Sequence, residues 1–452
     1  MTIDNCTILE EAEKIPLETK CKNLIAWLTS DPEFSMSKNL KIQKDKFNGI
    51  GLFYDNTIDS EDVVLNIPSK FLINRLTCIE YFKGPAQENS FWKEIFNKYI
   101  CINTIQESWN SFHIIILYMY IEWFCIDVNE NSFHKPFFES LPASSFFEEN
   151  IPVLQYLTLS DDCRSENGEK LKKNLLIEFE NEFAKLLENI ILAENTLLPV
   201  LKNFSQNISL VKKRLRYLYM CINSRCLYYE VKRNNPFKED NLTLVPLVDF
   251  INHTDGESEF NSFVEVTKSM NLAKQNYRLH VKKKKLLTIN NELLFKYGCH
   301  NDCLLLNDYG FILQTPNPNN FNDVTEIILS ELNCYEIEYL KQISYFNDGD
   351  RYFLSPSESS MFFNTQIAIY VMSLNLDFPN LKQVKQFPKI KQMKVNNYIK
   401  TMESTKNFNL VVMQLKKKYN KQLEQKISTL KQLSYCPKSI IELIEKYYIQ
   451  EI

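Results

Sequence analysis

Pro246-Leu247-Val248-Asp249-Phe250-Ile251-Asn252-His253 is the most informative segment of the chain. It closes a strongly apolar run that begins at Leu242, and the period and composition predict a strand over 242–250. An Asp, an Asn and a His at one strand end must be hydrogen-bonded if they are buried. Seen alone, the stretch is equally consistent with a functional site and with a network that only closes a turn.

Glycine marks two further places in the sequence. The chain has only eight glycines, and four of them fall in the segment Asn48-Gly49-Ile50-Gly51 and after the tyrosines of Tyr297-Gly298 and Tyr309-Gly310-Phe311. Glycine lets a ligand approach the backbone closely, so the first segment could hold a small polar cofactor through main-chain groups. Many tight turns have the same composition, however, and 23 tyrosines make a single Tyr-Gly pair uninformative.

The order of predicted elements indicates an α+β protein. Short strands and turns are expected over 40–72, with one strand at the apolar run 63–68, and helices over about 90–225. Strands are expected again at 242–250, 262–266, 277–281 and 286–289, and helices after Pro316. Apolar residues at helical spacing, from Val412 to Leu430, predict a buried helix face in the last hundred residues. A β fold interrupted by a helical insertion is one of the few layouts this order allows.

These motifs together resemble the SET-domain methyltransferases related to the RuBisCO large-subunit lysine methyltransferase. The resemblance rests on Asn48–Leu52, Ser224-Arg225, Pro246–His253, Tyr297-Gly298 and Leu304–Phe311, in that order. Ser132–Pro142 is similar to a landmark of that subfamily's helical insertion. The resemblance covers residues of about 20 to 315, and the C-terminal helices match only in position and composition.

The resemblance implies a four-part organisation. Residues 1–75 would form the N-terminal part of the SET domain, 76–215 the helical insertion, 216–315 the C-terminal part with the catalytic motifs, and 316–452 an all-α substrate-binding domain. The fold class expected is therefore α+β, a SET-domain β fold with a large helical insertion and a helical C-terminal domain.

Roles for individual residues also follow from the resemblance. Tyr297 would be the catalytic tyrosine that faces the methyl group and the incoming nitrogen. Tyr229 and Asp249 would lie toward the substrate. The residues expected to bind S-adenosylmethionine are Asn48, Gly49, Ile50, Arg225, Asn252, His253, Tyr297, Tyr309 and Phe311.

Two positions depart from the subfamily pattern. Asn48 stands where an acidic residue often precedes the first glycine, so it can hydrogen-bond there but brings no charge. Asn290-Asn291 stands where a glycine commonly precedes the acid at Glu292, and asparagine tolerates left-handed turns. The first departure bears on cofactor affinity.

The chemistry implied is methyl transfer from S-adenosylmethionine to a lysine of a non-histone protein, with ribosomal proteins and translation factors as the expected substrates. A sulfonium methyl is already activated, so alignment of a neutral amine is the main requirement and no metal is expected. Free lysine has a pKa of about 10.4 and must lose a proton first. Tyr297 would then orient the reacting groups rather than act as a strong base. A histidine acceptor, or a silent SET scaffold that binds proteins, are the alternatives.

Composition limits the partners and the compartment. A formal net charge of −4 argues against phosphate neutralisation as the main source of affinity, so neither nucleic acid nor a membrane is expected as a partner. Ile114–Cys125 is too short to span a bilayer and predicts a buried helix. The polar, acidic start Met1–Glu13 predicts no signal peptide, reduced thiols, and a cytoplasmic location with the nucleus as alternative.

A zinc- or nucleic-acid-associated protein is a third reading. Cys299, His300 and Cys303 are the tightest group of metal-ligand residue types, but a fourth ligand is missing nearby in the sequence. The run Lys282–Lys285 is interpreted as a solvated turn between two strands rather than as a phosphate-binding patch.

Overall fold

The computed structural model divides the chain into two compact units. It describes residues 7–45, 49–54, 62–83, 109–125, 132–154, 180–202, 205, 207–229, 241–255, 262–265, 275–281, 292–313, 317, 319–342, 345–347, 349–354, 362–373, 406–431, 442 and 445. The first unit holds the described residues up to 299 together with 307–310. The second holds 300–306 and the described residues from 311 onward. The four-part division expected from the sequence remains a prediction.

Short strands of the first unit form several small sheets. They are β1 (Ser35–Met36), β2 (Leu40–Lys44), β3 (Ile50–Tyr54), β4 (Asp62–Ile67), β5 (Ile73–Asn74), β6 (Leu227–Tyr228), β7 (Leu242–Leu244), β8 (Asn252–His253), β9 (Ser262–Glu265), β10 (Tyr277–Val281) and β11 (Leu294–Phe295). Among the described residues, one antiparallel sheet has the order β1-β4-β10-β9 and another the order β5-β7-β6. The hairpin β2-β3 and the parallel pair β8-β11 complete the set.

Alternation of side chains explains why β10 forms where the sequence predicts it. Tyr277, Leu279 and Val281 are buried, and the two residues between them are half-buried. This period of two turns one face of the sheet toward the core. Partner residues on β4, from Val64 to Ile67, supply further buried side chains, so the predicted strands at 63–68 and 277–281 are confirmed.

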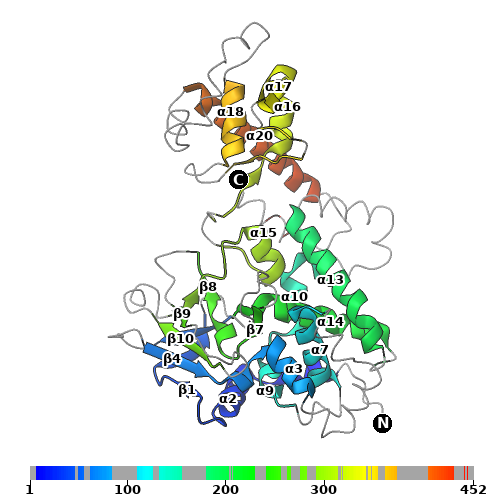
Figure 1. Cartoon of the computed structure of the whole chain (residues 1–452), viewed down its shortest axis with the longest axis vertical. Helices are drawn as coiled ribbons and strands as arrows, with labels where there is room; N and C mark the ends of the chain where they lie inside the picture. Colours follow the sequence, from blue (N-terminus) through cyan, green and yellow to red (C-terminus); the bar gives the residue numbers. More distant parts are fainter. Residues whose placement is uncertain are drawn as a thin grey trace. The chain divides into compact units, whose positions relative to one another are not determined.

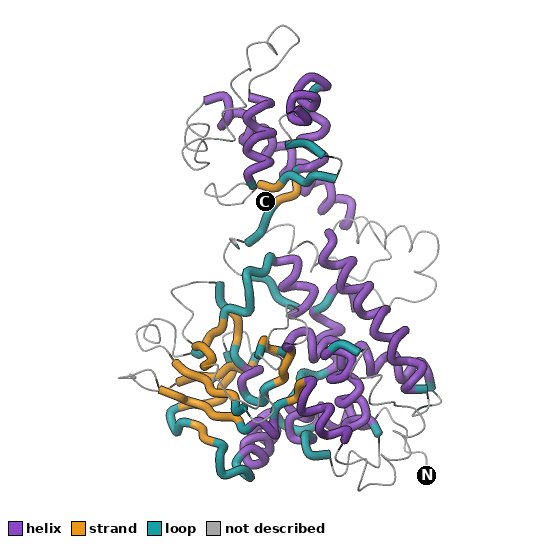
Figure 2. Tube along the Cα trace, in the orientation of Figure 1, coloured by secondary structure: helices purple, strands orange, loops and turns teal. Residues whose placement is uncertain are grey.

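Helices pack beside the small sheets of the first unit (Figures 1 and 2). They are α1 (Thr7–Lys14), α2 (Leu17–Leu28), α3 (Arg75–Lys83), α7 (Ser111–Phe124), α9 (Lys135–Ser140), α10 (Ser144–Asn150), α13 (Glu180–Leu201) and α14 (Ile208–Arg225). Asparagine side chains cap two of them: Asn110 accepts a hydrogen bond from the His113 N–H and Asn207 one from the Leu210 N–H. The helical character predicted over about 90–225 is therefore confirmed for the described part of that range.

Helix α7 is buried on all sides. Almost every residue from Ser111 to Phe124 is shielded from solvent, which explains the apolar run found in the sequence. Among the described residues, none of the helices combines the length and the apolar character required to cross a membrane. The prediction that this run forms a buried helix is confirmed.

The strand predicted over 242–250 is confirmed only for its first residues. β7 ends at Leu244, and a short 3-10 helix, η4 (Val248–Phe250), takes the place of the rest. Pro246 has no N–H for a sheet, and Leu247 adopts a positive φ of 70°. The chain therefore turns, and the turn carries Asp249 inward while Asn252 and His253 enter the separate strand β8.

A buried polar cluster ties α3, α7 and the start of α9 together. Glu122 accepts hydrogen bonds from the Tyr81 hydroxyl and from Ser132 Oγ. One turn earlier on α7, the Tyr118 hydroxyl and His134 Nδ1 share a hydrogen bond of 2.5 Å. Burial raises the pKa of Glu122, whereas it lowers the pKa of His134 to about 3. The imidazole is therefore neutral in the folded protein at any pH above that value.

We expect acid to destabilise the protein through His134. Unfolded histidine has a pKa of about 6.5, so below that pH the unfolded chain takes up a proton that the folded chain refuses. Stability is then present above pH 6.5 and falls by about 1.4 kcal/mol per pH unit toward pH 3. Urea titrations of wild-type and His134→Gln protein from pH 7 to 5 measure the difference. Equal pH slopes for the two proteins would contradict it.

The second unit is mainly helical. Its elements are α15 (Asp302–Leu304), α16 (Thr325–Glu331), α17 (Cys334–Gln342), α18 (Phe363–Ser373) and α20 (Lys406–Lys431), with the antiparallel pair β12 (Asn322–Asp323) and β13 (Phe353–Leu354); the π-helix η7 (Leu305–Tyr309) runs from this unit into the first. On α20, Leu415, Tyr419 and Leu423 are buried, Val412 and Ile427 are half-buried, and the side chain of Leu430 is not described. The stripe predicted from the sequence is thus confirmed as core.

The first turn of the second unit is held by amides. The Asp302 carboxylate is buried and accepts hydrogen bonds from Asn317 Nδ2 at 2.9 Å and Asn320 Nδ2 at 2.8 Å. Asn320 in turn accepts the Asp302 N–H at 2.8 Å. The asparagines of this proline-rich segment therefore have a structural use.

Candidate active site

Three segments far apart in the sequence meet at the strand pair β8-β11. Asn252 lies opposite Leu294 and His253 opposite Phe295 in a parallel register. The Leu293 N–H donates to the carbonyl oxygen of Leu52 on β3 at 2.7 Å. The Pro246–His253 motif, the segment before Tyr297 and the glycine-containing hairpin are therefore side by side.

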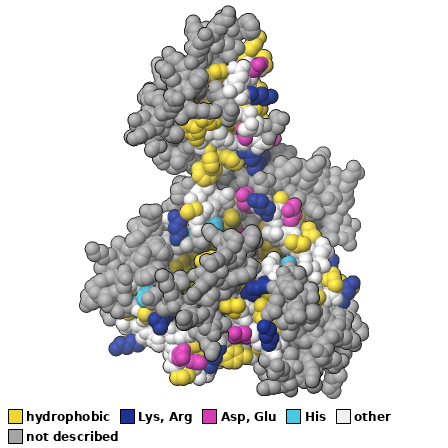
Figure 3. Space-filling model, in the orientation of Figure 1, with side chains coloured by type: hydrophobic (Ala, Val, Ile, Leu, Met, Phe, Trp, Pro, Cys, Tyr) yellow, Lys and Arg dark blue, Asp and Glu magenta, His cyan; other side chains and the backbone are white. Residues whose placement is uncertain are grey.

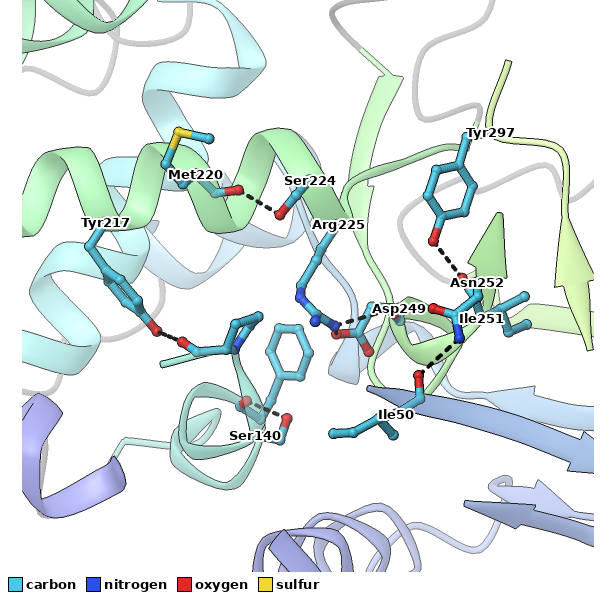
Figure 4. A network of polar contacts seen from close by, with 12 residues as sticks. Ile50, Ser140, Tyr217, Met220, Ser224, Arg225, Asp249, Ile251, Asn252 and Tyr297 are labelled. Atoms are coloured by element: carbon cyan, nitrogen blue, oxygen red, sulfur yellow. Dashed lines mark hydrogen bonds and ion pairs between the residues drawn. The ribbon is translucent and has the colours of Figure 1, made fainter. Parts of the chain in front are cut away.

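Tyr297 lies beside His253 and Tyr309. Its hydroxyl donates to the Ile251 carbonyl oxygen at 2.7 Å (Figure 4). Its backbone N–H donates to His253 Nδ1 at 3.1 Å. The ring centroid is 5.0 Å from that of His253 and 5.1 Å from that of Tyr309. The phenol is thus fixed from both ends and stands in an aromatic cluster.

Burial raises the pKa of the Tyr297 phenol well above its ordinary value. The Arg225 guanidinium opposes this, while the negative charges of Asp249 and Glu292 add to it. Tyr297 is therefore a neutral phenol at physiological pH. A group of that kind can donate or accept a hydrogen bond, but it is not a phenolate base.

The Asn252 carboxamide is held by three oxygen atoms, two from the β2-β3 hairpin and one from the segment before β11. Its Nδ2 donates to Glu292 Oε1 at 2.8 Å, to Asp45 Oδ2 at 3.1 Å and to the Ile50 carbonyl oxygen at 3.2 Å. Asp45 Oδ1 also accepts the Gly49 N–H at 2.8 Å. This amide is the point at which the hairpin, β8 and the segment before β11 are tied together.

Close packing of these carboxylates explains both glycines of the hairpin. A Cβ at Gly49 would lie 2.7 Å from Asp45 Oδ2, and one at Gly51 would lie 2.8 Å from Glu292 Oε1. Neither distance is sterically allowed, so any side chain at these positions would displace a carboxylate. The packing of Asp45 and Glu292 is thus sufficient by itself to require glycine at both positions.

Arg225 and Asp249 form a mostly buried ion pair beside this cluster. Arg225, the last residue of α14, donates to Asp249 Oδ2 at 2.8 Å and to the Asp249 carbonyl oxygen at 3.0 Å (Figure 4). Burial raises the pKa of Asp249, and the guanidinium lowers it. Among the described residues, Asp249 Oδ1 and Arg225 Nε are buried without a hydrogen-bond partner. The pair thus retains hydrogen-bonding capacity.

Most of the predicted site residues that the structure describes come together. Gly49, Ile50, Asn252, His253, Tyr297 and Tyr309 belong to the cluster described above, and the charges of Arg225 and Asp249 act on Tyr297. Asn48 lies outside the described residues. The roles assigned to all of these residues remain predictions.

Tyr229 and Phe311 are placed differently. The Tyr229 hydroxyl donates to the Asn276 carbonyl oxygen and accepts from Gln275 Nε2, both at 2.8 Å, and its ring packs on Tyr277. Its polar group is therefore engaged within the first unit's sheet region. Phe311 lies in the second unit, where its N–H donates to the Leu305 carbonyl oxygen. Their substrate- and cofactor-binding roles remain predictions.

Asp45 and Glu292 were not predicted as site residues. Asp45 precedes the glycine turn and could be taken for a solvated turn residue, and Glu292 enters the sequence analysis only as the acid that follows Asn290-Asn291. The sequence signal for both was the pair of glycines, since a close approach at each must have a cause. The side chains that approach the two glycines could be identified only from the three-dimensional structure.

The zinc reading gains no support from the geometry. In the part of the chain that the structure describes, no three His, Cys, Asp or Glu side chains gather as ligands of a metal ion. Cys299 is exposed and Cys303 is buried, and none of the eight described cysteines forms a disulfide. Lys282–Lys285 and the strand predicted at 286–289 lie outside the described residues. On the face shown in Figure 3, charged side chains of both signs are interspersed.

Comparison with known proteins places this site in context. No protein-family model matches the chain. The chain is 22% identical over 362 residues to ribosomal lysine N-methyltransferase 2 of Saccharomyces cerevisiae, covering 69% of this chain and 74% of that protein. It is 23% identical over 326 residues to ribosomal lysine N-methyltransferase set11 of Schizosaccharomyces pombe, covering 72% and 68%. The resemblance to SET-domain lysine methyltransferases is thus confirmed in sequence.

Solved structures were also compared. The SET domain of LSMT bound to lysine and AdoHcy gives a TM-score of 0.49 at 15% identity, over 97% of this chain and 91% of that chain. Rubisco LSMT bound to AdoMet gives 0.44 at 14% identity, over 96% and 90%. The α+β class expected from the sequence is confirmed by the elements of the first unit.

Proposed function

We propose that this protein transfers a methyl group from S-adenosylmethionine to a lysine side chain of a ribosomal protein. The observation that carries the proposal is the cluster of Asn252, His253 and Tyr297 at the strand pair β8-β11 of the first unit. The names of the two curated relatives support lysine as the acceptor and a ribosomal protein as the substrate.

The site residues fit the amino-acid end of S-adenosylmethionine. That end carries an ammonium and a carboxylate group. Carboxylate and carbonyl oxygens surround Asn252, which suits an ammonium, and Arg225 Nε is a buried donor with no partner among the described residues, which suits a carboxylate. Gly49 and Ile50 would add main-chain groups, and Tyr297 and Tyr309 an aromatic wall.

The chain's own residues would have to orient the reaction rather than carry protons. S-adenosylmethionine, when bound, supplies an activated methyl group. Tyr297 is held at its hydroxyl by the Ile251 carbonyl and at its backbone by His253, so it would offer a fixed oxygen beside the acceptor nitrogen. Burial raises the pKa of the Tyr297 phenol, so Tyr297 would not take up the proton of the lysine ammonium as a phenolate. That proton must therefore pass to water before the amine attacks. Alignment within such a rigid site can lower a barrier by several kcal/mol.

Cofactor binding and transfer test this proposal. S-adenosylmethionine at about 100 times its Kd should raise the free energy of unfolding by about 2.7 kcal/mol. Tritium from labelled S-adenosylmethionine should enter a band of a ribosomal fraction from cells lacking the protein, and mass spectrometry would identify the acceptor. A methylated histidine would correct the acceptor, whereas binding without any transfer would favour the protein-binding scaffold.

A further inference from the structure

The Asp45 carboxylate uses both of its oxygens at the site. Oδ1 accepts the Gly49 N–H at 2.8 Å, and Oδ2 accepts Asn252 Nδ2 at 3.1 Å. The Gly49 carbonyl oxygen also accepts the Asp45 N–H at 3.1 Å, so this residue closes the turn in both directions. A carboxylate has two acceptor atoms, whereas the carboxamide of the same length has only one.

This contact decides which way the Asn252 carboxamide points. Asp45 and Glu292 both present carboxylate oxygens to the same nitrogen. A flipped amide would set its own oxygen against these two carboxylates, so only one orientation satisfies the network. Because the two arms of an amide are rigidly related, fixing Nδ2 also fixes where Oδ1 of Asn252 is presented.

We propose that Asp45 is a positioning residue that sets the affinity for S-adenosylmethionine by orienting Asn252 and the Gly49–Ile50 backbone. The inference rests on the proposed function. In this chain Asn48 brings no negative charge before the glycine turn, and Asp45, three residues earlier, supplies a carboxylate at Gly49 itself. Asp45 would act through Gly49 and Asn252, so its effect is expected on binding and not on the chemical step.

Calorimetry with S-adenosylhomocysteine and steady-state kinetics test the assignment. Asp45→Ala should weaken binding about 10- to 100-fold, the range for hydrogen bonds to a charged group. Asp45→Asn keeps one of the two acceptor contacts and should lie between Asp45→Ala and wild type. At saturating S-adenosylmethionine the turnover number of both should stay within about threefold of wild type, the loss appearing in KM. Glu18→Gln, an exposed acid paired only with Lys22 among the described residues, is the control.

A double-mutant cycle tests the geometry without any activity measurement. Gly49→Ala places a Cβ 2.7 Å from Asp45 Oδ2, so alone it should weaken S-adenosylhomocysteine binding and lower the unfolding temperature. In the Asp45→Ala background the obstructing oxygen is gone, and the same substitution should add little further loss. Fully additive losses would overturn the proposed contact.

The outcomes separate this inference from the proposed function. Wild-type affinity in both Asp45 variants overturns the assignment, and so does a loss confined to the turnover number. A wild-type chain that binds neither S-adenosylmethionine nor S-adenosylhomocysteine overturns the proposed function, and the cofactor role of Asp45 falls with it. In that case the unfolding temperatures of the cycle still report whether Asp45 occupies the space above Gly49.

Discussion

Tyr297→Phe is expected to lower the turnover number of methyl transfer about 10- to 1,000-fold, the cost of removing one preorganised polar group from an active site. The substitution removes the hydroxyl that is fixed on the Ile251 carbonyl but keeps the ring between His253 and Tyr309. The KM for S-adenosylmethionine should therefore change little. Single-turnover assays with labelled cofactor measure the chemical step directly.

Tyr54→Phe is the matched control for this prediction. Tyr54 is a buried tyrosine on β3 of the same unit, and its hydroxyl accepts a long hydrogen bond of 3.5 Å from Ser37 Oγ. Turnover by this variant should equal that of wild type. If Tyr297→Phe also turned over at the wild-type rate, Tyr297 would have no part in the reaction.

Arg225→Met is expected to lower the free energy of unfolding by about 3–5 kcal/mol near pH 7, because it leaves the Asp249 carboxylate buried without its counter-charge. Burial already raises the pKa of Asp249, and removing the guanidinium removes the influence that lowers it. A buried carboxyl group without a counter-charge has the lowest free-energy cost in its protonated, neutral form. The gap between variant and wild type should therefore narrow as pH falls toward about 4 and widen as pH rises.

Adding Asp249→Asn to Arg225→Met tests the cause of this loss. The second substitution removes the unpaired charge, so the double variant should be more stable at pH 7 than Arg225→Met and should lose the variant's pH dependence. Urea unfolding monitored by tryptophan fluorescence gives both quantities. A double variant no more stable than Arg225→Met would attribute the loss to packing rather than to charge.

Periodicity and motif order predicted much of this molecule. The strands at 63–68 and 277–281, the buried helix at 114–125 and the stripe on α20 follow from alternation and helical spacing, which local burial enforces. The motif resemblance predicts that Asn252, His253 and Tyr297 belong to one site, and the strand pair β8-β11 provides the physical link.

Long-range contacts could not be predicted in the same way. Asp45 and Asn252 are 207 residues apart, and nothing in either local sequence indicates that one accepts a hydrogen bond from the other. The break after Leu244 depends on a positive φ at Leu247, a residue type that rarely adopts one. Contacts with the rest of the fold offset the cost of that conformation. Because the local sequence does not reveal those contacts, its apolar pattern favours the longer strand.

The hydrogen bond from Leu293 to Leu52 joins two residues that are synthesised far apart in time. A ribosome adding about 5–20 residues per second needs roughly 10 to 50 s to proceed from one partner to the other. The nascent hairpin lacks Asn252 for most of that interval and Glu292 until its end. The nascent chain therefore cannot gain stability from the cofactor until the first unit is nearly complete, and chaperones that bind exposed apolar strands have that interval in which to act.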